Sequence, residues 1–279
     1  MSNALFGFVI IVIVAVALFL LARLFLYKLL ERKLFENDRI ITQTPAELGL
    51  PHEELLIDAG SRQLQAWLVS APETTKPNPV ILILHGQGEN VSNWVGVQAY
   101  LFDHGISSMV FDYSAYGHST GQARLRHLQE DALAAYGMLE QKVARNAAKY
   151  ALGFSMGAAI MLEAFSDADH SLAGLILAEP FLSIRDLVVA WGIIPKPLAF
   201  IGPDVLNNLN TIGQVNRPLL VVHSQDDEIV PLWHAKRLYQ AANAPKELVV
   251  HDKFQHNAIW QTPGDDYWLP IVRFVQGEN

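Results

Sequence analysis

A serine stands inside a short strand, turn and helix pattern at residues 150–157, and this pattern constrains the fold more than any other feature. The apolar run Tyr150–Phe154 leads directly into Ser155. Gly153 and Gly157 flank that serine, and the apolar sequence Ala-Ala-Ile-Met-Leu follows. Glycine lets the backbone turn where a Cβ would collide, so the hydroxyl can stand clear of the fold. The pattern predicts a nucleophile at the end of a buried strand.

Two later apolar runs also end in polar side chains. Residues 218–222 lead into His223 and the acidic cluster 226–228, and residues 246–251 lead into His256. In an open parallel α/β sheet, the carboxyl ends of the strands share one edge, where functional sites assemble. We therefore expect a hydroxyl, a carboxylate and an imidazole to meet at this edge.

Four stretches besides the serine turn carry a family resemblance. They are residues 84–88 (Leu-His-Gly-Gln-Gly), 111–121, 223–231 and 256–257. Together these motifs resemble the α/β-hydrolase superfamily over roughly residues 50–279. They most resemble single-pass, membrane-anchored serine hydrolases with acyl-esterase, lysophospholipase or aminopeptidase-like relatives. The resemblance implies an α/β-hydrolase fold with a mostly parallel central sheet and helices on both faces.

The resemblance also implies a catalytic triad. Ser155 would be the nucleophile, His256 the general base, and Asp227 the carboxylate that orients the imidazole. Asp226 and Glu228 compete for the role of the acid. The family pattern His-Gly-x-x-Asp-x-x-Val-Pro, aligned on the strand-end histidine and the following Val-Pro, favours Asp227.

An oxyanion hole and an acyl pocket are expected beside this triad. Met156 follows the nucleophile and Gln87 lies in the loop after a strand, so their backbone N–H groups are the expected oxyanion donors. His251 is a rival to His256 but lies inside a strand run. His85 is also interpreted as a support of the loop at 84–88. Residues expected to line the substrate pocket are His85, Gly86, Tyr113, Phe181, Leu187 and Trp191.

Composition excludes several other classes of function. The 279 residues carry a net charge of −8, so nucleic acid is not expected as a partner. Cysteine is absent, which excludes disulfides, thiolate nucleophiles and thiolate metal sites. The ten histidines show no metal-ligand spacing. We expect no metal and no cofactor.

The N-terminal segment is predicted to be a membrane anchor at residues 1–27. Ala4–Ala22 contains no charged residue, and at ~1.5 Å per residue it spans a bilayer core of ~30 Å. A cleaved signal peptide is the alternative, but the apolar stretch exceeds the usual core of ~7 to 15 residues and no positive side chain precedes it. The basic residues Arg23, Lys28, Arg32 and Lys33 all follow the span. A single-pass membrane protein with its catalytic domain on the cytoplasmic side is therefore expected.

The rest of the chain divides into a linker at 28–50 and one hydrolase domain at 51–279. Strand-like and helix-like runs alternate after residue 79, which predicts right-handed crossovers. Residues 181–215 break this rhythm with three prolines and an apolar excess. We expect a compact apolar lid there, although a packing helix with a loop is an alternative interpretation.

Three hypotheses for function follow. The first is a serine hydrolase of acyl esters, including small-molecule, lipid-like or thioester substrates, with medium or long acyl chains preferred. The second is a peptidase of the same fold, for which Glu179, just after a strand end, offers a carboxylate for a substrate amino terminus. The third is a non-catalytic, membrane-tethered binding module. The sequence identifies no protein partner.

Overall fold

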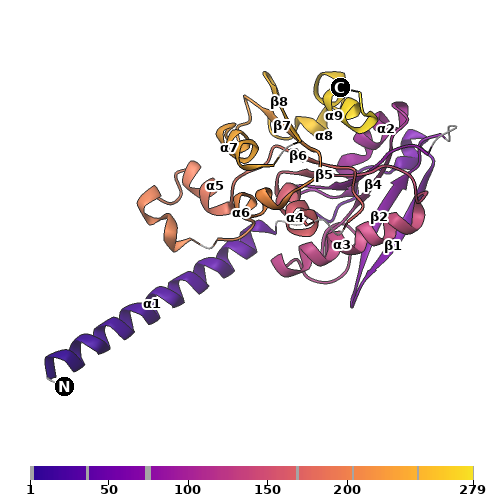
Figure 1. Cartoon of the computed structure of the whole chain (residues 1–279). Helices are drawn as coiled ribbons and strands as arrows, with labels where there is room; N and C mark the ends of the chain where they lie inside the picture. The colour runs from indigo at the N-terminus through magenta and orange to yellow at the C-terminus, as the bar shows by residue number, and fades with distance from the viewer. Residues whose placement is uncertain are drawn as a thin grey trace.

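An eight-stranded sheet forms the centre of the protein in a computed structural model that describes residues 3–35, 38–72, 77–167, 170–202, 204–243 and 245–278. The strand order is β1-β2-β4-β3-β5-β6-β7-β8. All neighbouring strands from β4 to β8 in this order are parallel, whereas β2 is antiparallel to both β1 and β4. This mostly parallel sheet confirms the predicted fold class (Figure 1). The strands are β1 (His52–Ala59), β2 (Arg62–Val69), β3 (Val80–Leu84), β4 (Ser107–Phe111), β5 (Lys149–Phe154), β6 (Gly174–Ala178), β7 (Leu219–Ser224) and β8 (Lys246–His251).

Helices cover both faces of the sheet because the inner strands are apolar on both sides. In β3, Leu82 and Leu84 join one core cluster, whereas Ile81 and Ile83 join the other. This alternation is the two-residue period of a strand, and burial on both faces explains the unbroken apolar run. The first cluster includes side chains of α3 (Leu125–Lys142), α4 (Met156–Phe165) and α7 (Trp233–Ala241). The second includes side chains of α2 (Val95–Asp103), α8 (Ala258–Gln261) and α9 (Asp265–Gln276).

The N-terminal helix α1 (Asn3–Leu34) projects away from the domain (Figure 1). Its segment Leu5–Leu29 is long and apolar enough to cross a membrane: an 18-residue stretch within it has a mean hydropathy of 3.3, and none of that stretch is buried inside the protein. The helix continues past residue 27, where the sequence predicted a linker to begin. Residues 28–34 include leucine, glutamate, lysine and arginine, which all favour helix, so nothing in this stretch ends it.

The described part of the predicted linker is fixed to the domain. The carbonyl of Asp38 accepts from Gly117 N at 2.9 Å, and that of Ile40 accepts from Asn90 Nδ2 at 2.9 Å. Thr42 N donates to Ser92 Oγ at 3.2 Å. A 3₁₀ helix, η1 (Pro45–Leu48), then leads to β1. These contacts hold the segment between α1 and the sheet against the domain rather than leaving it a free tether.

The segment predicted as a lid forms the connection between β6 and β7. It contains α5 (Ile184–Ala190), η3 (Lys196–Ile201), α6 (Asn208–Thr211) and η4 (Ile212–Gln214). Its first residues, Phe181 to Ile184, are buried in the core, whereas most of the described residues from Trp191 to Phe200 are exposed. The connection therefore has a buried base and an exposed outer part.

Candidate active site

Ser155 occupies a strained turn between β5 and α4. Its φ and ψ angles are 51° and −113°, a left-handed conformation that costs a non-glycine residue free energy. A Cβ on Gly157 would lie 1.9 Å from the carbonyl oxygen of Leu84, and a Cβ on Gly153 would lie 2.5 Å from Ala158 Cα. Both positions therefore require glycine. The turn presents a partly exposed hydroxyl at the carboxyl end of the sheet.

The side chains of Ser155, His256 and Asp227 form one hydrogen-bonded chain. His256 Nε2 lies 3.0 Å from Ser155 Oγ, and His256 Nδ1 lies 2.7 Å from Asp227 Oδ2. The three residues come from the loops after β5, β8 and β7. Such a chain lets a neutral imidazole accept the hydroxyl proton while the carboxylate stabilises the positive charge that forms.

Asp227 is held ionised in a buried position. Its Oδ1 atom accepts hydrogen bonds from the backbone N–H groups of Ile229 and Val230, each at 2.8 Å. Burial acts to raise the pKa of Asp227, but the hydrogen bond and charge of His256 outweigh it, so the pKa lies below its ordinary value. The carboxylate can therefore act as a fixed negative charge.

The residues that competed with Asp227 and His256 in the sequence lie outside the hydrogen-bonded chain to Ser155. Asp226 is exposed, and Glu228 Oε2 accepts from the backbone N–H of His256 at 3.0 Å. Glu228 therefore positions the loop that carries the histidine without contacting its ring nitrogens in any described hydrogen bond. The ring of His251 packs against Phe254 and Tyr267.

Glu179 lies behind Asp227, at the end of β6. It is 0% exposed and accepts hydrogen bonds from Ser224 N, Ser224 Oγ and Tyr267 OH at 2.9 to 3.0 Å. Burial, followed by the charge of Asp227, raises its pKa well above the ordinary value. Because it is buried and committed to these bonds, Glu179 does not offer a carboxylate to a substrate amino terminus. No pattern in the sequence indicated that Glu179 would support the acid.

Glu179, His223 and Asp227 also form the one group with metal-ligand spacing among the described residues, with one ligand atom of each within 4.8 Å. Their oxygens already accept protein hydrogen bonds, and His223 Nε2 bonds to the carbonyl of Val230 at 2.8 Å. Burial lowers the pKa of His223 to about 4. We therefore assign this group to the support of Asp227 rather than to a cation.

The predicted oxyanion donors belong to two segments that the turn brings close. Met156 is the first residue of α4, and Gln87 lies in the loop after β3. The close approach of Gly157 to the carbonyl of Leu84 places the first turn of α4 against the end of β3. A helix N-terminus next to a backbone loop is the arrangement that stabilises a developing oxyanion.

A buried glutamate holds the loop that carries Gln87. Glu89 accepts from Gly86 N at 3.0 Å, from Trp94 Nε1 at 3.0 Å and from Trp260 Nε1 at 3.1 Å. Burial raises its pKa to about 7. Since Trp260 lies in α8, just after His256, Glu89 connects the oxyanion loop with the loop of the base. Sequence reasoning missed this residue, although a charged side chain next to a glycine-rich turn was a signal.

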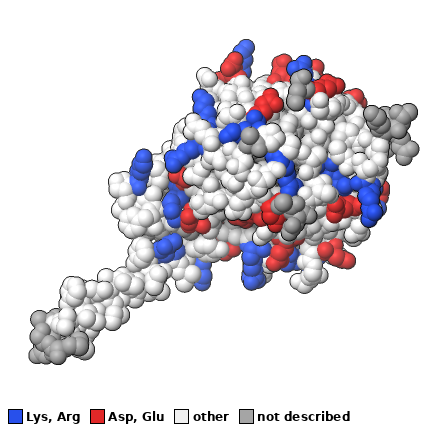
Figure 2. All heavy atoms as spheres, in the orientation of Figure 1, with Lys and Arg blue, Asp and Glu red and all other residues white. Residues whose placement is uncertain are grey.

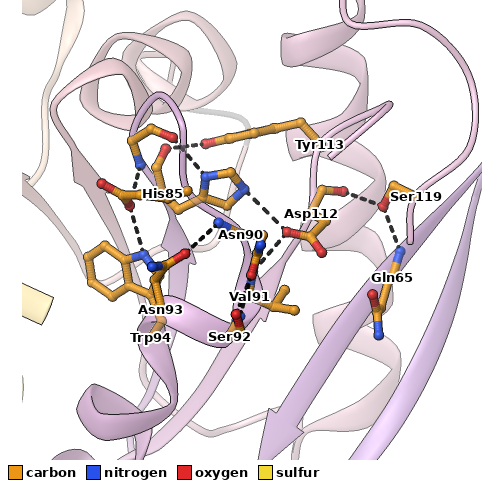
Figure 3. A network of polar contacts seen from close by, with 12 residues as sticks. Gln65, His85, Asn90, Val91, Ser92, Asn93, Trp94, Asp112, Tyr113 and Ser119 are labelled. Carbon is orange, nitrogen blue, oxygen red and sulfur yellow. Dashed lines mark hydrogen bonds and ion pairs between the residues drawn. The ribbon is translucent and has the colours of Figure 1, made fainter. Parts of the chain in front are cut away.

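His85 and Tyr113 lie beneath the same loop. Both are fully buried; His85 Nδ1 donates to Gly86 O at 2.8 Å, and Tyr113 OH donates to His85 O at 3.0 Å (Figure 3). The expectation that they contact substrate does not fit this burial, and we assign them to the support of the loop.

Asp112 completes this network. Its Oδ1 atom accepts from Val91 N at 2.8 Å and lies 3.6 Å from His85 Nε2 (Figure 3). Burial raises the pKa of Asp112 to about 8 and lowers that of His85 to about 4. At neutral pH the two side chains are therefore a neutral pair rather than an ion pair.

The remaining predicted pocket residues divide between core and surface. Phe181 and Leu187 are buried, and Trp191 is 47% exposed. Trp191 Nε1 donates to the carbonyl of Ile229 at 2.7 Å. Because Ile229 N in turn donates to Asp227, this bond joins the lid to the loop of the acid. Gly86 contributes through its backbone, since a Cβ there would lie 2.8 Å from Glu89 Oε1.

Comparisons with known proteins agree with this architecture. The model of the family Hydrolase_4, serine aminopeptidase S33, matches residues 75–211, which include the serine turn. The chain is 28% identical over 239 residues to the uncharacterized membrane protein YNL320W of Saccharomyces cerevisiae, covering 83% of this chain and 82% of that protein. It is 26% identical over 213 residues to the lysophosphatidylserine lipase ABHD12 of Danio rerio, covering 67% of this chain and 56% of that protein.

A solved structure shows the same fold. The Pyrococcus furiosus esterase Pf2001 superposes with a TM-score of 0.71 at 20% identity, covering 88% of this chain and 98% of the esterase. The strand order, the serine turn and the family match agree, and one of the relatives is named a lipase. The chain therefore has the α/β-hydrolase fold, and the family model and relatives that it matches support a hydrolase of this fold.

Proposed function

We propose that the protein is a serine hydrolase that cleaves acyl esters through an acyl-enzyme on Ser155. The observation that carries the proposal is the continuous chain from Ser155 Oγ through His256 to Asp227, with distances of 3.0 and 2.7 Å. His256 takes the hydroxyl proton as the oxygen attacks the ester carbonyl. The N–H groups of Met156 and Gln87 stabilise the oxyanion.

The second half of the reaction uses the same groups. The protonated imidazole of His256 donates its proton to the departing alkoxide, and the acyl group remains on Ser155 as an ester. Water then enters, and His256 accepts one of its protons as the oxygen attacks the acyl carbon. The imidazolium returns that proton to Ser155 Oγ as the acyl–oxygen bond breaks, which releases the carboxylic acid and restores the free enzyme. Asp227 stays ionised throughout, consistent with its lowered pKa.

A lipid-like acyl substrate fits the surroundings of this site. The chain carries an apolar helix able to cross a membrane, and the predicted lid is apolar. One relative is named a lysophosphatidylserine lipase, and a protein of the same fold is an esterase. The basic residues that follow the helix support a cytoplasmic position for the catalytic domain.

A peptidase of the same fold is the second candidate, because the matching family model is that of a serine aminopeptidase. An aminopeptidase needs a group that binds the substrate amino terminus. The carboxylate that the sequence offered for this purpose, Glu179, is 0% exposed and hydrogen-bonded inside the fold. This burial favours esters over peptides.

Labelling with a fluorophosphonate probe tests the nucleophile. The wild-type chain in detergent should be labelled, Ser155→Ala should not, and Ser61→Ala, which changes an exposed turn serine, should behave like wild type. A folded wild-type chain that resists the probe would refute catalysis and favour a binding module.

An acyl-chain series tests the substrate class. Burying each methylene is worth ~0.8 kcal/mol, or roughly a fourfold gain in transition-state binding, so octanoyl esters should exceed acetyl esters of the same alcohol in kcat/KM. Aminoacyl amides in parallel separate ester from peptide use. Faster cleavage of the amides would overturn the ester assignment.

A further inference from the structure

An apolar surface occupies the outer part of the lid. Its members, which we call the lid face, are the side chains of Trp191, Ile193, Leu198 and Phe200, exposed by 47%, 65%, 46% and 58%, together with Ile229, exposed by 38%. Exposed apolar side chains of this size, gathered within one short segment, indicate a surface that something else covers.

The membrane-spanning helix contacts this face. The rings of Phe200 and Phe19 stack with their centroids 6.3 Å apart and an interplanar angle of 26°. Phe19 lies one helical turn, ~6 Å, before Arg23, the first charged residue of α1. Phe200 therefore reaches a level on α1 where the helix is already purely apolar.

The direction of the lid agrees with this contact. The helix α1 and the lid elements α5 and η3 project from the same side of the domain (Figure 1). Lys and Arg side chains border the white surface where the lid meets α1 (Figure 2). Lys196, within the lid, is exposed and can extend its ammonium group to lipid headgroups while its methylenes stay among apolar atoms.

We propose that the lid face inserts into the same bilayer that α1 crosses, to a depth of about one helical turn below the headgroups. The occupant of the apolar face is lipid, because the face is continuous with the segment of α1 whose composition requires lipid around it. Tryptophan at such a boundary, represented by Trp191, is typical of a membrane interface.

Insertion also acts on the site. The indole of Trp191 is hydrogen-bonded to Ile229, two residues from Asp227, so the inserted segment adjoins the loop of the acid. Resting on the proposed esterase function, this geometry implies that the acyl substrate enters from the lipid phase beneath the lid rather than from water.

Fluorescence quenching tests the insertion without any reaction. The full-length Ser155→Ala chain is reconstituted into phosphatidylcholine vesicles whose acyl chains carry bromine near the headgroup, and the quenching assigned to Trp191 is the difference from a Trp191→Phe chain. We expect clear quenching, reduced at least ~twofold by the pair Ile193→Ser and Phe200→Ser, which weakens burial in lipid. Leu56→Ser, which removes an equally exposed leucine on β1, should leave it unchanged.

Two results would overturn the proposal. Trp191 fluorescence that is insensitive to brominated lipid would show that the face lies outside the bilayer. Cross-linking of two chains through the lid, with quenching absent, would identify the face as a surface for self-association.

An activity arm separates this proposal from the proposed function. The activity arm uses the chain with its nucleophile Ser155 intact. There, Ile193→Ser combined with Phe200→Ser should lower the turnover of a long-chain ester held in vesicles by roughly tenfold and leave the turnover of a short soluble ester within ~twofold of its starting value. If no ester is hydrolysed while Trp191 is quenched, the esterase assignment fails and the insertion stands. If both esters are hydrolysed while Trp191 is not quenched, the insertion fails and the esterase stands.

Discussion

The Nε2 atom of His256 lies 3.0 Å from the hydroxyl oxygen of Ser155, although the two residues are 101 positions apart in the chain. No single helix, strand or turn contains both residues, so their distance depends on how the sheet is assembled. Ser155 is fixed by the turn after β5, and His256 by the loop after β8, which Glu228 holds through a hydrogen bond to the backbone. The parallel sheet brings both loops to one edge, and the chemistry proposed for the site depends on that placement.

The acid can be identified by comparing the three neighbouring carboxylates. Asp227→Asn should lower kcat on a soluble ester by ~10⁴-fold, because the amide no longer stabilises the imidazolium or fixes its tautomer. Asp226→Asn should stay within ~twofold, since that side chain is exposed. Glu228→Gln should lower kcat by ~tenfold, because the amide oxygen is a weaker acceptor than the carboxylate for the hydrogen bond from His256 N.

These rates are measured at one pH with circular dichroism as a check of folding. A large loss in the Asp226 variant, with the Asp227 variant active, would reverse the assignment of the acid.

The buried Glu179 should affect the alkaline side of the pH profile. Because its pKa is raised well above the ordinary value, Glu179 keeps its proton to a higher pH than an exposed glutamate does, and its ionisation would place a second negative charge against Asp227. Glu179→Gln keeps a neutral group of the same shape, so activity at pH 7 should stay within ~threefold and should persist at alkaline pH, where wild type declines.

One further variant serves as the control for this test. Glu179→Ala removes the partner of Ser224 and Tyr267 and should reduce stability as well as activity. Identical alkaline limbs for wild type and the glutamine variant would show that Glu179 does not titrate in the observed range.

Asp112 should make the fold less stable as pH rises. Because burial raises its folded pKa to about 8 from the ordinary 3.8, the folded protein binds this proton more tightly than the unfolded chain does. The stability contribution is fully present below about pH 4 and is lost as the pH rises towards 8. Asp112→Asn removes that loss, so its free energy of unfolding should gain up to ~4 kcal/mol relative to wild type between pH 4 and 7.

Denaturant unfolding of the detergent-solubilised chain at several pH values measures this difference. Asp58→Asn, on the exposed side of β1, serves as the matched control and should follow wild type. Parallel stability curves for wild type and the Asp112 variant would contradict the assignment of a buried neutral carboxyl.

Two glycines should respond in opposite directions to the same substitution. Gly157→Ala places a Cβ 1.9 Å from the Leu84 carbonyl oxygen, so the free energy of unfolding should fall by more than ~3 kcal/mol or the variant should fail to fold. Gly137 lies inside α3, and no atom lies within 4 Å of the Cβ that Gly137→Ala would add. The free energy of unfolding of this variant should therefore rise by ~0.5 to 1 kcal/mol. Thermal unfolding of both variants checks this, and a stable Gly157 variant would show that α4 and β3 can separate.

Local patterns in the sequence determined much of this protein. The alternation of strand-like and helix-like runs predicted a mostly parallel sheet, and the motifs around Ser155, Asp227 and His256 resembled those of the α/β hydrolases. The sheet and the comparisons confirm that fold. The uncharged run that begins at Ala4 predicted a helix long enough to span a membrane, because length and apolar composition are properties of the segment alone.

Only the tertiary structure determined which polar side chains are buried and which distant residues come into contact. Glu179 and Glu89 both follow strands, and no local pattern distinguishes a buried carboxylate beneath the triad from one open to a substrate. His85 and Tyr113 likewise became supports of a loop because the packing above them leaves no surface. The contact between Phe19 and Phe200 joins residues that are far apart in the chain. The sequence encodes such contacts only through the packing of the whole chain, because each depends on where distant elements end in space.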